Sequence, residues 1–208
     1  MPDFHSLSLF VAAGLALNFI PGPDMLYVAA RGASEGRAAG IASALGIGAG
    51  TLVHVALVAL GLAALLAALP VAYLALRITG AIYLMYLGVR AFRSQAVLAS
   101  PRLKPASLTG VFAQGVVTNV FNPKVALFFL AFLPQFVDQS RGNPALQVIA
   151  LGLLFDTTGT LVNLAVALGS SRVGAHLRGT GRANAVLHKL TGVLFIGIGF
   201  RLLLGNRR

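Results

Sequence analysis

Two short stretches place charged side chains and prolines inside apolar runs that are long enough to cross a membrane. The first is Asn18-Phe19-Ile20-Pro21-Gly22-Pro23-Asp24, and the second is Asn119-Val120-Phe121-Asn122-Pro123-Lys124. A carboxylate at the bilayer centre costs roughly 2.5 to 3.5 kcal/mol on insertion scales, and proline removes a backbone donor. Breaks of this kind are expected where the backbone lines a polar cavity, so the two stretches predict a substrate path.

The two charges suit a ligand that carries both signs, such as an amino acid zwitterion. Asp24 could bind an ammonium group or carry a coupling proton. Lys124 could hold a carboxylate or neutralise Asp24, and a salt bridge that only fixes helix packing is the structural alternative. We favour a substrate or gating role, because intramembrane charges are costly unless they are used or paired.

Other polar residues fall within the apolar runs. Asp156 and Asn163 lie seven residues apart, nearly on one helix face, and Asp156 is a second candidate for the proton site unless it is simply hydrated near the interface. His54 is a third candidate, although a hydrogen bond to a neighbouring helix is the more common role of a lone histidine. Gln114 and Thr118 share a face and extend the polar lining or bond to another helix.

Six apolar runs are long enough to position these residues as transmembrane helices, the first and fourth broken at the proline motifs. The predicted spans are residues 7–30, 39–67, 71–92, 109–133, 145–169 and 188–204. The fold class is therefore an all-α integral membrane protein. Within the second span, Gly36, Gly40, Gly46 and Gly50 form a small-residue face suited to close helix contact.

The spans divide into two halves within a single transporter domain, residues 1–208. Residues 1–93 and 109–208 each hold three spans, and residues 94–108 form a basic, proline-containing linker. Three spans per half make the second half start from the opposite side of the membrane, so the halves are predicted to be inverted repeats. Broken helices at corresponding positions of two such repeats are the best sequence indication of a binding site.

Composition excludes several other classes of protein. The chain has 208 residues, of which 57% are hydrophobic and 10% charged, which is too apolar for a soluble domain. The formal charge of +11 lies in short clusters between the apolar runs, so membrane topology explains it and nucleic acid is not an expected partner. There is no cysteine, which excludes thiolate metal sites, and no cofactor or metal is expected.

The basic residues also predict an orientation. The connections after the first, third and fifth spans carry ten lysines and arginines, among them Arg31 and Arg37, and the opposite side carries five. The positive-inside rule then places these connections in the cytoplasm and both termini in the periplasm. The N-terminus lacks the basic region of a signal peptide, so the first span is expected to remain in the protein.

Five segments resemble one known family, the LysE/RhtB amino acid exporters. They are Pro21 to Asp24, the glycine-rich run from Gly36 to Gly50, Tyr83 to Gly88, Asn119 to Phe129, and Leu133 to Phe136. The resemblance spans nearly the whole chain. It implies efflux of amino acids or close derivatives across the bacterial inner membrane, driven by proton exchange.

The resemblance carries the motifs at 21–24 and 122–124 over as functional positions. Some family members have an acid where this chain has Asn163, and Asp156 has no matched position, so the proton carrier stays open between Asp24 and Asp156. The substrate and the oligomeric state, including a homo-oligomer, stay open as well.

Three other functions compete with a proton-coupled carrier. A passive channel for small zwitterions could use the same broken helices. An intramembrane enzyme is disfavoured because the chain has no HExxH or GxSxG motif. A structural scaffold would not need a charge beside each proline break.

Overall fold

The computed structural model describes residues 3–68 and 105–173 and a few single positions. Those single positions are Ile78, Ile82, Met85, Tyr86, Val89 and Ile196. The predicted spans 71–92 and 188–204 and most of the basic linker lie outside the described residues. In the described part the chain is helical, with no strand.

The first broken helix consists of α1 (Phe4–Phe19) and α2 (Pro23–Glu35). The Asp3 side chain caps α1 by accepting a hydrogen bond from the Ser6 amide. Pro23 occupies the first turn of α2, where its missing N–H costs no helical bond. The two helices bend by 48°, and together they are long and apolar enough to span a membrane.

The second broken helix is built in the same way. It starts with α5 (Leu108–Val120), breaks at Asn122, and continues through the short helix α6 (Pro123–Leu127), with a bend of 47°. A π-helical turn, η1 (Phe128–Phe132), and a 3₁₀ turn, η2 (Leu133–Phe136), extend it. Both breaks predicted from the proline motifs are thus confirmed in position.

Two long helices pack beside the broken ones. These are α3 (Arg37–Ala68) and α7 (Pro144–Val173), which follows the 3₁₀ turn η3 (Gln139–Arg141). Each contains a segment that alone could cross a membrane, Arg37–Gly61 and Pro144–Ser170. The described residues therefore supply two clear spans, or up to four if each bent pair is one span. The full six-span count lies beyond them.

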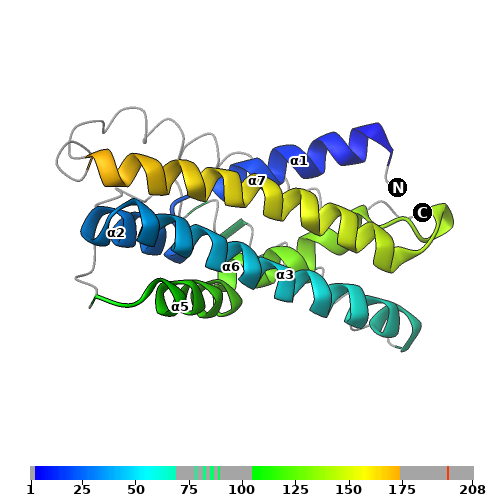
Figure 1. The fold of residues 1–208 in the computed structure, drawn as a ribbon. Coiled ribbons are helices and arrows are strands. Elements are labelled where there is room, and N and C mark those ends of the chain that lie inside the picture. The colour runs from blue at the N-terminus through cyan, green and yellow to red at the C-terminus, as the bar shows by residue number, and fades with distance from the viewer. Residues whose placement is uncertain are drawn as a thin grey trace.

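The described helices of the two halves run in opposite directions through the bundle (Figure 1). The end of α2, the start of α3, the start of α5 and the end of α7 all lie at one end. The breaks of both bent helices lie near the middle. This antiparallel course of corresponding elements is the arrangement expected of inverted repeats.

Glycines of α3 allow its backbone to pack closely against α5 and α7. A Cβ atom on Gly46 would lie 2.2 Å from the Phe112 carbonyl oxygen of α5, and one on Gly50 would lie 2.7 Å from the Asn119 side chain. The prediction of a small-residue contact face is confirmed at these positions and at Gly40, which faces Ala167. It is wrong for Gly36, which ends α2 with a φ of 88° and has open space around it.

An aromatic cluster fills the end of the bundle away from Glu35. Phe10 of α1 packs on Phe128, Phe132 and Phe136, and Phe128 stacks on Phe155 of α7 at 4.4 Å between ring centroids. These residues belong to the larger buried apolar core. Phe155 also borders the cavity described next, so this cluster forms one wall of the site.

Candidate functional site at the two helix breaks

A small cavity lies where the two broken helices meet α3 and α7. Six residues singled out from the sequence line it, namely Asn18, Asp24, Asn119, Lys124, Asp156 and Asn163. Its volume is about 20 Å³, which is room for about one water molecule. The sequence therefore located the residues of the cavity, and the fold brings them together from both halves of the chain.

Asp24 and Asn119 join the two halves directly. Asn119 Nδ2 donates a 2.9 Å hydrogen bond to Asp24 Oδ2, and Asp24 is 6% exposed. In the part of the chain that the structure describes, the other oxygen, Oδ1, is buried without a hydrogen-bond partner. A buried carboxylate oxygen in this state leaves room for one more donor.

Lys124 crosses from α6 to the end of α1. Its Nζ donates to the carbonyl oxygens of Leu17, at 3.2 Å, and Ile20, at 3.1 Å. The ion pairs among the described residues are Arg31–Glu35 and Arg141–Asp138, so Lys124 forms no salt bridge with Asp24. The two charges therefore line the same cavity without a direct ion pair.

The rest of the Asn122-Pro123-Lys124 motif shapes the break. The Asn122 side chain accepts a hydrogen bond from the Lys124 amide at 3.0 Å and so caps α6. Gly22 lies against the lysine stem, since a Cβ there would be 3.1 Å from Nζ. Neither residue lines the cavity, and neither do Pro21, Pro23 or Pro123.

Helix α7 supplies the opposite wall of the cavity. Asp156 accepts from the Thr160 hydroxyl at 3.4 Å, and both residues line the cavity with Asn163. Asn18 donates to the Thr158 hydroxyl at 3.1 Å and thereby fixes the end of α1 on α7. Asp156 therefore lines the same cavity as Asp24.

His54 lies outside the cavity. Its Nε2 is 3.3 Å from the Asn119 carbonyl oxygen, and its ring stacks on Phe129. This matches the expectation that a lone histidine bonds to a neighbouring helix. Its contact fixes the backbone of Asn119, so His54 supports the site without bordering it.

Several cavity residues were not predicted. Thr51 donates to Asn119 Oδ1 at 3.4 Å, and the apolar wall comes from Met25, Ile47, Val125 and Phe155. Apolar side chains in a membrane protein carry no distinguishing sequence signal. Thr51 had a faint one, because it is a polar residue inside the apolar run 39–67.

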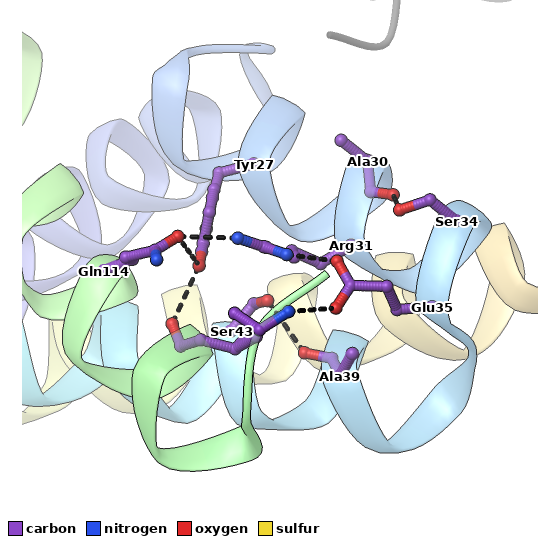
Figure 2. A network of polar contacts seen from close by, with 10 residues as sticks. Tyr27, Ala30, Arg31, Ser34, Glu35, Ala39, Ser43 and Gln114 are labelled. Carbon is purple, nitrogen blue, oxygen red and sulfur yellow. Dashed lines mark hydrogen bonds and ion pairs between the residues drawn. The ribbon is translucent and has the colours of Figure 1, made fainter. Parts of the chain in front are cut away.

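A second polar cluster lies between α2 and α5, as Figure 2 shows. Arg31, only 2% exposed, pairs with Glu35 and donates to Gln114 Oε1 at 2.6 Å. Tyr27 donates to the Val111 carbonyl at 2.8 Å, and the Ala106 amide donates to Glu35 at 3.3 Å. We call this set the α2–α5 network.

The α2–α5 network corrects one expectation, for Arg31, and decides between the two alternatives for Gln114. Arg31 is a buried helical residue and not a loop charge, although removing it leaves the basic excess on the same side. Gln114 binds another helix instead of lining the cavity, and Thr118 bonds to the Gln114 carbonyl in its own helix.

Comparison with known proteins shows to which family the chain belongs. The model of the LysE type translocator family matches residues 15–206. This chain belongs to the LysE family. An uncharacterized membrane protein of Pseudomonas aeruginosa is 34% identical over 199 residues, which cover 93% of this chain and 92% of that protein. No solved structure matches the chain.

Other relatives of this LysE-family chain have names that state a substrate. Leucine efflux proteins of Enterobacter sp. strain 638 and of Klebsiella pneumoniae are each 26% identical to it. Both matches cover 93% of this chain and 92% of the relative. The chain is thus a membrane protein of a translocator family, and the family resemblance inferred from the motifs is confirmed.

Proposed function

We propose that this protein exports amino acids or close derivatives across the bacterial inner membrane by proton-coupled antiport. The observation that carries the proposal is the cavity at the two helix breaks, where an acid and a lysine from opposite halves meet. Family membership supports the export of amino acids in general.

The cavity offers both signs that a zwitterion needs. Asp24 Oδ1 can accept from the substrate ammonium group, because it has no partner among the described residues. A lysine ammonium has three donors, and the Leu17 and Ile20 carbonyls use two of those of Lys124. The third is available to the substrate carboxylate.

Export of the substrate is coupled to entry of a proton if one carboxylate binds either a proton or the substrate ammonium group, but not both. Asp24 is placed to do both, since an uncompensated buried carboxylate is costly and either cation relieves that cost. Release of the substrate to the periplasm then permits protonation, and the proton leaves in the cytoplasm. Asp156, across the cavity, is the rival proton site.

Substrate passage requires the cavity to enlarge. Room for about one water cannot hold an amino acid, which supports a carrier that opens to one side at a time over a passive channel. Leucine is the first substrate to test, because two relatives are named leucine efflux proteins and the apolar wall includes Met25, Ile47 and Phe155.

The experiment has two stages. Overexpression in a sensitive strain is screened for resistance to single amino acids and analogues, and each hit is assayed by counterflow in proteoliposomes. We expect counterflow of a hit without a gradient and net export only with a proton gradient. Net, gradient-independent conductance would indicate the channel, and failure of every amino acid to give resistance or counterflow would contradict the proposal.

A further inference from the structure

The contacts of Lys124 resemble a cation site rather than an ion pair. Its ammonium group lies on two backbone carbonyls, those of Leu17 and Ile20, at 3.2 and 3.1 Å. Both lie at the C-terminal end of α1, where the Leu17 carbonyl also accepts from the Ile20 amide at 3.2 Å and the carbonyl of the cap residue Ile20 lies beyond the last helical turn. The helix dipole gives this end a partial negative charge.

Such half-helix ends serve a known purpose in transporters with broken helices. There, unwound carbonyls and C-terminal half-helix ends commonly coordinate a coupling sodium ion or proton. In this chain the same kind of oxygen ligands is taken by an amine of the protein itself. The glycine at position 22 leaves space for this amine, because a Cβ atom on Gly22 would lie 3.1 Å from Lys124 Nζ and 3.3 Å from its Cε.

The lysine also connects the two halves at their breaks. Its backbone lies in the first turn of α6, and its ammonium group closes the last turn of α1. A bound metal ion in this position would do the same and would be exchangeable. A lysine is permanently attached and cannot be released to either side of the membrane.

We infer that Lys124 is a tethered cation that replaces a bound alkali ion at the end of α1 and makes transport independent of Na⁺ and K⁺. The inference rests on the proposed function and goes beyond it, because it assigns Lys124 a positioning role through the α1 backbone. It predicts that a small free cation can substitute for a missing Lys124 side chain.

The test uses the full-length protein in proteoliposomes, with the substrate found in the resistance screen. Wild-type counterflow should be equal in sodium, potassium and choline media. Lys124→Ala should lose counterflow in choline and regain part of it with methylammonium, which is small enough to reach the vacated carbonyls. Lys124→Met should lose it without regain, because its longer side chain fills the vacated space.

Thermal unfolding provides a readout that does not depend on transport. Methylammonium should raise the melting temperature of Lys124→Ala and leave those of the wild type and Lys124→Met unchanged. The inference is overturned if the wild type needs Na⁺ or K⁺, if Lys124→Ala keeps full activity in choline, or if methylammonium neither restores nor stabilises it.

The wild-type measurement alone keeps the inference falsifiable should Lys124→Ala not fold. The same wild-type measurement also distinguishes failure of the proposed export function from failure of the inference about Lys124. Absence of wild-type counterflow contradicts the proposed function, whereas sodium-dependent wild-type counterflow contradicts only the tethered cation.

Discussion

Asn119 makes three contacts of the site at once. Its amide donates to Asp24, its side-chain oxygen accepts from Thr51, and its carbonyl oxygen meets His54. Because Asn119 is only 1% exposed, bulk water cannot replace any of these hydrogen bonds. The Asp24 carboxylate is therefore oriented from the other half of the chain, with Asn119 as its direct hydrogen-bond donor.

Replacing Asn119 should expose this dependence. Asn119→Ala removes the donor to Asp24 and should lower the free energy of unfolding by about 1.5–3 kcal/mol, the value of a hydrogen bond to a charged group. The measurement is thermal or denaturant unfolding in detergent. Thr118→Ala is the matched control, because Thr118 is half-buried and its hydroxyl donates to the Gln114 carbonyl of its own helix. Equal stability of the two variants would contradict the assigned role.

Variants of the two acids of the cavity, Asp24 and Asp156, should differ in transport assays. Asp24→Asn should abolish both counterflow and gradient-driven export, because it removes the acceptor for the substrate ammonium. Asp156→Asn should retain counterflow and proton coupling. If Asp156→Asn instead keeps counterflow but loses gradient-driven export, the proton carrier is Asp156, and the role proposed for Asp24 in coupling is wrong.

At the scale of elements, backbone contact between α3 and α5 fixes where the second broken helix lies. A methyl group on Gly46 would lie 2.2 Å from the Phe112 carbonyl oxygen, so the two helices would have to move apart. Overpacking of this kind costs about 1–3 kcal/mol. The cost falls on the helix that carries Asn119 to the cavity.

Gly46→Ala should therefore reduce the melting temperature and weaken transport together. Gly61→Ala, on the same helix and with no described atom within 4 Å of its Cβ position, should not lower stability, because alanine is the better helix former by up to about 1 kcal/mol. Melting curves and counterflow of both variants test this. A stable, active Gly46→Ala would show that α3 and α5 are not held in close backbone contact.

The α2–α5 network joins the same elements by charge. Removing one partner of a buried ion pair costs about 3–5 kcal/mol, because the other charge stays buried, while removing both costs less. We expect Arg31→Met to destabilise the protein more than the double variant with Glu35→Leu. Unfolding of the wild type, of Arg31→Met, of Glu35→Leu and of the double variant completes a double-mutant cycle, and additive effects would contradict a coupled pair.

The sequence predicted where the helices break, but it did not predict the contacts and angles at those breaks. The breaks were predictable, because a proline next to a charge is too costly inside an apolar run unless the helix is interrupted there. The partners of Lys124 were not, since backbone carbonyls occur at every residue and leave no mark in the sequence. Arg31 was misplaced because it lies near the end of an apolar run, where a loop charge and a buried charge look alike. The π-helical turn η1 has no residue signature, and neither do the angles of the two bends.

At the scale of the whole molecule, the ends of the described helices set the orientation to be tested. Thr109 lies at the end where α2 finishes and α5 begins, and Ser140 lies at the other, both exposed. The chain has no cysteine, so single cysteines can be introduced without a background signal.

The positive-inside prediction then has a direct measurement. A thiol reagent that cannot cross membranes should label Ser140→Cys in spheroplasts and Thr109→Cys only in inverted vesicles. Thr109→Cys labelled from the periplasm would reverse the predicted orientation of the bundle.

The size of the cavity has a consequence for the energy balance of the cell. Among the described residues, the cavity has room for about one water molecule, which is too little for a file of waters along which protons could hop. Proteoliposomes that contain the protein should therefore hold a pH gradient as long as protein-free ones, and the gradient should decay when substrate is added inside. In this arrangement the proposed antiporter can remain in the membrane of an energised cell, with no substrate to export, without dissipating the proton gradient.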